Sequence, residues 1–285
     1  MGSIRKVLWI TLGLNVAVAM AKLLVGLSQG ALALVGDGIH SFSDASSNVI
    51  GLIGMYWAAK PADDDHHYGH HKVEIMAATA IAVFLFITAW EICKRAVLNM
   101  GQPVTANVDA LAFAVSIGTF GVNVFVATYE RRAARRLGSR FLEADAAHTA
   151  SDLWVTATVM VSLVALELGI PIVDPIFALG IGLYIGYIGW GILSKNATVL
   201  MDTAPLAPED VRREVLAVPG VLSCHKIRTR GWEGHIFIDL HVQIDPSLDT
   251  VQGHRIAHSV QEHVKAAIAG VEDVLIHTEP ARPEP

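Results

Sequence analysis

Charged residues are scarce in this sequence. Asp, Glu, Lys and Arg make up 17% of its 285 residues, while hydrophobic residues make up 53%. Soluble domains carry roughly 25% charged residues, so much of this chain is expected to lie in a lipid bilayer. Long acidic or basic blocks are missing as well, and the formal net charge is −6. A basic surface for nucleic acid is therefore not expected.

Cysteine and common catalytic motifs are also scarce or missing. Cys93 lies in an apolar run and Cys224 in a polar region, and no C-x-x-C pair occurs, which argues against a thiolate metal cluster or a redox motif. The H-E-x-x-H motif of zinc proteases is absent, and no glutamate stands beside a ligand pair as a base. An intramembrane metallohydrolase has little support, and we expect that the protein is not an enzyme.

Hydrophobic runs, by contrast, are abundant. A helix needs about 20 residues to cross about 30 Å of hydrocarbon. The fold class that we expect is an α-helical membrane protein, with six transmembrane helices within residues 1–202. The six runs that are long enough lie near residues 7–27, 33–59, 73–98, 107–129, 143–168 and 173–193.

Basic residues flank these runs on one side of the expected membrane. Arg5 and Lys6 precede the first run, and five arginines lie in a connection that we expect at residues 130–140. Because lysine and arginine beside a span favour the cytoplasm, both termini are expected there. The five arginines are Arg131, Arg132, Arg135, Arg136 and Arg140.

The composition turns soluble after Asp202, which predicts a separate cytoplasmic domain at residues 203–285. Pro205 and Pro208 mark the break, and a short helix is expected from there to about Val218. Alternating and helical patterns then predict two strands, a helix and a last strand, so the order αββαβ favours a small sheet with helices on one face. These later elements are expected at residues 222–230, 236–244, 251–269 and 271–277.

The pattern D-x-x-H-x-x-S-D occurs twice, at residues 37–44 in the second expected span and at residues 145–152 in the fifth. At about 100° per residue, positions i, i+3 and i+7 share one helix face, so each copy forms a polar stripe. An ionisable residue in mid-membrane costs roughly 2.5–3.5 kcal/mol on insertion scales, and a divalent cation would compensate several of them. A single buried Ser or His more commonly hydrogen-bonds helices together, but a duplicated pair favours a metal site.

The two stripes predict a tetrahedral zinc site. Two imidazole nitrogens and two carboxylate oxygens form a ligand set that suits Zn²⁺. Asp37 and Asp145 lie one turn before each histidine, where they could hold its second nitrogen or line an ion entrance. The four predicted ligands are His40, Asp44, His148 and Asp152.

Three segments together resemble the cation diffusion facilitator family: residues 36–44 (GDGIHSFSD), 61–74 (PADDDHHYGHHKVE) and 145–152 (DAAHTASD). The resemblance runs over nearly the whole chain. It implies a homodimer that exchanges divalent metal for protons at the four predicted ligands, with a ferredoxin-like, metallochaperone-like cytoplasmic domain. Known bacterial members have Asp at the position of His40, so this ligand set is more similar to that of zinc-restricted members.

The resemblance implies further metal sites. The trio Asp63, His66 and His70 would form a site in the loop between the second and third spans, where His67 and His71 are local alternatives. Lys72 and Asp202 match a pair that links two protomers near the membrane surface. Positions that carry metal in the cytoplasmic domain of relatives are matched by His225, His241, His254, His277 and Glu279.

These inferences lead to one expected function and one alternative. We expect efflux of a divalent cation by alternating access, with Zn²⁺ as the transported and regulatory ion and Co²⁺, Cd²⁺, Fe²⁺ or Mn²⁺ as further candidates. The expected host is the bacterial inner membrane. The alternative is a membrane-embedded metal sensor or scaffold, in which metal drives dimerisation and the intramembrane residues are structural.

Overall fold

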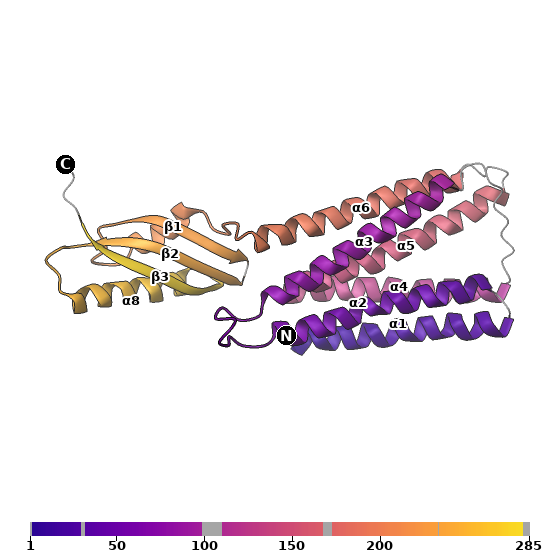
Figure 1. The fold of residues 1–285 in the computed structure, drawn as a ribbon, viewed down its shortest axis with the longest axis horizontal. Helices are drawn as coiled ribbons and strands as arrows, with labels where there is room; N and C mark the ends of the chain where they lie inside the picture. The colour runs from indigo at the N-terminus through magenta and orange to yellow at the C-terminus, as the bar shows by residue number, and fades with distance from the viewer. Residues whose placement is uncertain (1, 30–31, 99–109, 168–172, 233, 282–285) are drawn as a thin grey trace. The chain divides into compact units, whose positions relative to one another are not determined.

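The computed structural model describes residues 2–29, 32–98, 110–167, 173–232 and 234–281 (Figure 1). Within the described helices, the side chains of Asp37, His40 and Asp44 lie outside the description. The chain divides into two compact units, Met1–Asn196 and Ala197–Pro285. Each unit is described by itself below.

Six long helices make up nearly all of the described part of the first unit. Three stretches are long and apolar enough to cross a membrane by length and composition, Gly2–Val25, Lys72–Leu98 and Pro175–Leu200. The other three expected spans, in α2, α4 and α5, remain a prediction. The helices are α1 (Gly2–Gln29), α2 (Leu32–Ala58), α3 (Lys72–Leu98), α4 (Ala110–Leu137), α5 (Arg140–Glu167) and α6 (Val173–Leu200).

Helix α1 packs along α2 and α4, and α5 packs against α3 and α4 (Figure 1). Large apolar side chains such as Leu8, Met55 and Phe141 are fully buried where these helices meet. Gly51 permits the close approach of α2 to the start of α5, because a Cβ atom there would overlap the Phe141 ring. This contact holds one end of the bundle together beside the polar residues described below.

The predicted basic loop at residues 130–140 is wrong. Helix α4 continues to Leu137, so Arg131–Arg136 are helical, and Arg140 already belongs to α5. The connection is only Gly138, with φ of +62°, and Ser139. The Ser139 Oγ accepts the Leu142 N–H at 3.3 Å, which caps α5 as serine commonly does at a helix start. Arginine is a good helix former, so an arginine-rich segment does not by itself end a helix.

The second unit confirms the predicted order αββαβ. Strands β1 and β2 are antiparallel, β2 and β3 are parallel, and the sheet order is β1-β2-β3. Alternate residues of β2, such as Ile238 and Leu240, are buried together with Val211 of α7 and Val260 of α8. Both helices therefore cover one face of the sheet, and the opposite face is open within this unit. The elements are α7 (Pro208–Leu216), β1 (Ser223–Trp232), β2 (His235–Ile244), α8 (Thr250–Ala267) and β3 (Val271–Pro280).

Candidate metal sites

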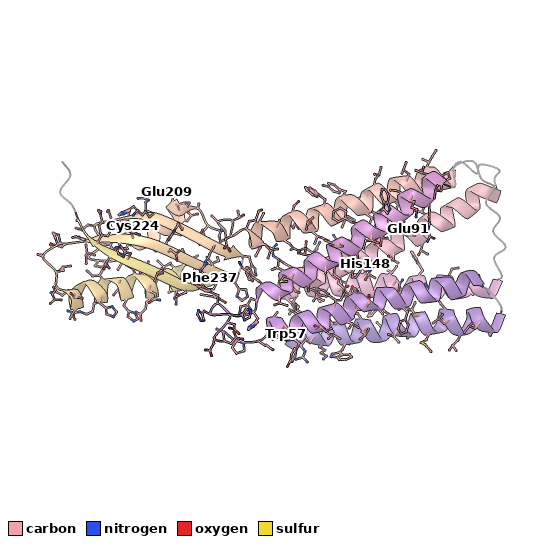
Figure 2. All side chains as sticks on the ribbon, in the orientation of Figure 1. Trp57, Glu91, His148, Glu209, Cys224 and Phe237 are labelled. Atoms are coloured by element: carbon pink, nitrogen blue, oxygen red, sulfur yellow. The ribbon has the colours of Figure 1, made fainter. Side chains whose placement is uncertain are left out.

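His148 and Asp152 of α5 line a small, partly enclosed cavity in the helical unit, and Figure 2 labels His148 within the bundle. The two residues are four positions apart, so they lie on one face of the helix, one turn from each other. His148 is 6% exposed. The cavity volume is about 20 Å³, enough for one particle the size of a water molecule. The remaining lining residues are Asn15, Val18, Ser41, Asn123 and Thr149.

Helix α2 contributes Ser41 to this cavity. Ser41 directly follows His40 in the sequence and accepts a hydrogen bond from the buried Lys22 ammonium group at 2.9 Å. The side chains of His40, Asp44 and Asp37 lie outside the described residues. The structure thus brings two of the four predicted ligands to one cavity, and the complete set of four remains a prediction.

Asp145 is fully buried beside this cavity and accepts a hydrogen bond from the Asn48 amide at 2.8 Å. The same amide group donates to the Thr11 hydroxyl at 3.2 Å, and the Asn48 carbonyl accepts from Asn15 at 2.8 Å. This network joins α1, α2 and α5 through polar groups that no lipid could satisfy. Holding three helices in register is therefore the role that the described contacts of Asp145 support.

Glu130 is a buried residue within the range that the sequence predicts as a loop. It is fully buried in α4, and its carboxyl accepts a hydrogen bond from the Thr149 hydroxyl at 3.3 Å. Thr149 also lines the cavity. Helical periodicity could have indicated this burial, because Val126, Glu130 and Ala134 recur every four residues and share the buried face of α4.

The residues Asp63, His66 and His70 form what we call the loop cluster, and their ligand atoms lie within 4.8 Å of one another. The Asp63 carboxylate is 3.1 Å from His66 Nδ1 and 3.4 Å from His70 Nε2. The Nδ1 of the buried His70 lies 3.1 Å from the Pro61 carbonyl oxygen, an arrangement that orients Nε2 toward a metal. The trio from the resemblance is thus assembled around one point.

The charge state of Asp63 suits a cation. Burial raises the pKa of this carboxyl, but hydrogen bonds from the backbone N–H and the ring of His66 lower it, and the net pKa lies below its usual range. The carboxylate is therefore ionised at neutral pH. An ionised carboxylate beside two imidazoles is a ligand set that zinc accepts.

A second group lies on the open face of the sheet in the second unit, and we call it the sheet cluster: His225, His241, His277 and Glu279. His225 pairs with His241 across β1 and β2, and His241 pairs with His277 across β2 and β3. The Glu279 carboxylate is 2.6 Å from His241 Nδ1, 3.3 Å from His225 Nε2 and 3.8 Å from His277 Nε2. The ligand atoms of His225, His241 and Glu279 all lie within 4.8 Å of one another.

The other predicted site residues lie elsewhere. His254 is on α8, where its ring stacks with that of His258 at 6.4 Å, so within the described residues of this unit it does not join the sheet cluster. Lys72 is the first residue of α3. Asp202 follows α6 and has a positive φ of 52°.

Replacing Glu279 with glutamine should weaken zinc binding by the sheet cluster by about tenfold or more. The hydrogen bond with His241 lowers the pKa of the Glu279 carboxyl below its usual value. At pH values above the unfolded-state pKa of Glu279, the ionised carboxylate therefore stabilises the native state. This stabilisation is lost as the pH falls through the lower pKa of the folded state. We expect the wild-type unfolding temperature to decrease more than that of Glu279→Gln over this acidic range.

Zinc bound per chain in the presence of a competing chelator, and thermal unfolding at several pH values, measure these two effects. Glu262→Gln is the matched control, because Glu262 also pairs with a histidine, His258 at 3.3 Å, outside the cluster. Equal zinc binding by Glu279→Gln and the control would mean that Glu279 does not bind the metal.

Comparison with known proteins decides the family. The model of the cation efflux transmembrane domain matches residues 8–201, and the model of the cation efflux protein cytoplasmic domain matches residues 205–281. The chain belongs to the cation diffusion facilitator family. This facilitator is 30% identical over 281 residues to an uncharacterized transporter of Methanocaldococcus jannaschii, covering 98% of this chain and 99% of the relative.

Further relatives of this facilitator are named as efflux pumps. It is 30% identical over 287 residues to the cation-efflux pump FieF of Shewanella oneidensis, covering 97% of this chain and 96% of the pump. Among solved structures, the cadmium form of a MamM CTD variant is 26% identical, and the match covers 26% of this chain and 91% of that chain, with a TM-score of 0.25. The family matches confirm the resemblance carried by the sequence motifs.

Proposed function

We propose that this cation diffusion facilitator exports Zn²⁺ in exchange for protons by alternating access. The observation that carries the proposal is the pair His148 and Asp152, one turn apart on α5, lining a partly enclosed cavity of about 20 Å³. An imidazole and a carboxylate are half of a tetrahedral zinc site. His40 and Asp44, at the same spacing in α2, would supply the other half.

Proton exchange follows from the chemistry of these ligands. A zinc ion binds neutral imidazole and ionised carboxylate, so binding the ion releases protons and protonation releases the ion. The reference pKa of histidine is about 6.5, which places this competition in the range where compartments differ in pH. In the proposed cycle, the site binds zinc while it is open to the cytoplasm. It then opens to the opposite side of the membrane and exchanges the ion for protons.

The neutral groups around the cavity limit the number of charges that would surround a bound ion. Asn15, Ser41, Asn123 and Thr149 offer amide and hydroxyl groups, and these groups can hydrogen-bond ligands or ion-bound water without adding charge. The only carboxylate among the described lining residues is Asp152. The charge that balances a divalent cation would therefore come from Asp152 together with Asp44.

We further propose that the loop cluster and the sheet cluster bind regulatory zinc in a homodimer. Both clusters lie outside the helices that would cross the membrane, so zinc bound there would report the cytoplasmic concentration and would not follow the ion path. Replacing His241 with alanine is expected to slow transport only partly. Complete loss of transport in a well-folded His241→Ala protein would instead make the cytoplasmic domain an obligatory gate.

Flux through proteoliposomes tests the proposal. Purified protein is reconstituted into vesicles that contain a zinc indicator in one set and a pH indicator in another. Zinc entry should be accompanied by proton movement in the opposite direction, and an imposed pH gradient should accelerate it. Metal binding without any flux would favour the sensor or scaffold, whereas flux without proton movement would rule out antiport.

A further inference from the structure

Four arginines form a stripe at the C-terminal end of α4. Arg131, Arg132, Arg135 and Arg136 are all exposed, and at about 100° per residue they fall within about 140° of the helix surface. Val126, Glu130 and Ala134 are buried on the opposite side of the helix. The arginine stripe therefore points away from the helices that pack against α4.

The same face of α4 is apolar before the stripe begins. Ile117, Val124 and Phe125 are 51%, 41% and 57% exposed, and Gly121 is exposed among them. By helical periodicity, all of these positions fall in the angular range of the arginine stripe, as does the exposed Thr128 that separates them from it. One continuous helix face thus changes from hydrocarbon side chains to arginines within about two turns, as expected where a helix leaves the hydrocarbon of a bilayer.

The length of the stripe matches the headgroup layer. Arg136 lies five positions after Arg131, which corresponds to about 7.5 Å along the axis. The polar layer of one leaflet is about 5–7 Å thick. In a helix that crosses the bilayer at this point, the guanidinium groups would lie at the depth where phospholipid phosphates are found.

These arginines also differ in their charge balance from the ion-paired arginines elsewhere on the surface. Arg95, Arg213 and Arg228 each have a carboxylate oxygen within 3.4 Å. Among the described residues, no ion pair involves any arginine of the stripe. Within the described residues, these four positive charges thus have no carboxylate oxygen at ion-pair distance.

We propose that the arginine stripe binds the phosphate groups of anionic phospholipids, with phosphatidylglycerol as the probe that tests this. The planar guanidinium group donates two parallel hydrogen bonds to a phosphate, a geometry that lysine lacks. The adjacent apolar face contacts the acyl chains of the same lipids. This inference rests on α4 crossing the bilayer and not on which cation is transported.

Lipid binding to the full-length protein tests the proposal. Purified protein in neutral detergent is titrated with phosphatidylglycerol or phosphatidylcholine, and native mass spectrometry counts the bound lipids. Two double variants each remove half of the stripe, Arg131→Gln with Arg135→Gln, and Arg132→Gln with Arg136→Gln. Each retains two arginines, so that membrane insertion keeps a basic flank.

The wild type should prefer phosphatidylglycerol, and the preference should decrease as salt increases. Each arginine near an anionic surface contributes roughly a fivefold factor in affinity, so each double variant should bind phosphatidylglycerol at least about tenfold more weakly. Phosphatidylcholine binding should not change. The control Arg213→Gln with Arg228→Gln removes the same charge from ion-paired positions and should bind as the wild type does.

Several results would overturn the proposal. Wild-type affinity for phosphatidylglycerol in both stripe variants would show that the arginines do not hold the lipid. An equal loss in the control variant would indicate a general effect of net charge. Displacement of phosphatidylglycerol by inorganic phosphate at equal concentration would assign the stripe to a soluble anion.

Discussion

Replacing Asp152 with alanine should abolish zinc transport in proteoliposomes, while the protein remains folded and inserted. Asp152 is the only carboxylate among the described residues that line the cavity. Its neutral neighbours donate or accept hydrogen bonds but cannot replace a negative charge next to a divalent cation. Removing one partner of a buried ion pair costs about 3–5 kcal/mol, which corresponds to a loss of two orders of magnitude or more in affinity.

The measurement is the initial rate of zinc uptake, together with the elution volume and melting temperature of the purified variant. Asp152→Asn keeps the shape of the side chain and should be nearly as inactive, which isolates the charge. Thr156→Ala is the matched control, because Thr156 lies one turn further along α5 and its hydroxyl donates to the Asp152 backbone carbonyl. Wild-type uptake by folded Asp152→Ala would make the assignment of the transport site wrong.

Replacing His40 with aspartate should change the transported metal. In the proposed site, this substitution turns two imidazoles and two carboxylates into one imidazole and three carboxylates. Imidazole favours zinc in a tight tetrahedron, whereas a carboxylate is a harder and often bidentate ligand that accepts larger cations with more oxygen donors. We expect His40→Asp to gain cadmium or manganese transport relative to zinc.

The same substitution should alter proton exchange. It removes a group that titrates near neutral pH, so fewer protons should move per metal ion and the pH optimum should shift. Metal-dependent proton flux with zinc, cadmium and manganese, over about two pH units around neutrality, measures both effects. An unchanged metal preference with unchanged proton stoichiometry would show that His40 does not touch the transported ion.

The sheet cluster shows which features of the second unit can be predicted from strand patterns. Alternation along residues 236–244 predicts that His241 faces away from the core, and the structure has Ile238 and Leu240 buried on the other face. The register that aligns His225, His241 and His277 across three strands depends on how the strands pair, including the irregularity between His225 and Arg228. The resemblance matched His254 to a metal-carrying position, but His254 lies on α8, outside the sheet cluster.

The arginines of α4 and the buried Glu130 show why the predicted loop failed. A segment rich in charged residues is interpreted as a solvent-exposed loop when only its composition is considered. The structure instead continues α4 through Arg136, with Glu130 buried and the arginines exposed on the far side. Which side of a helix is covered depends on neighbouring helices that are distant in the sequence, and periodicity alone does not name them.

By itself, the sequence determined the long apolar helices and the order αββαβ of the C-terminal unit, and it predicted the two polar stripes, because each follows from a local period of about 3.6 or 2 residues. Only the tertiary structure decided which polar groups share a space. It brought His148 and Asp152 to a cavity with Asn15 of α1 and Asn123 of α4, and it joined Asp145 to Asn48. Such contacts depend on the packing of helices far apart in the chain, and buried polar groups must find partners wherever that packing places them.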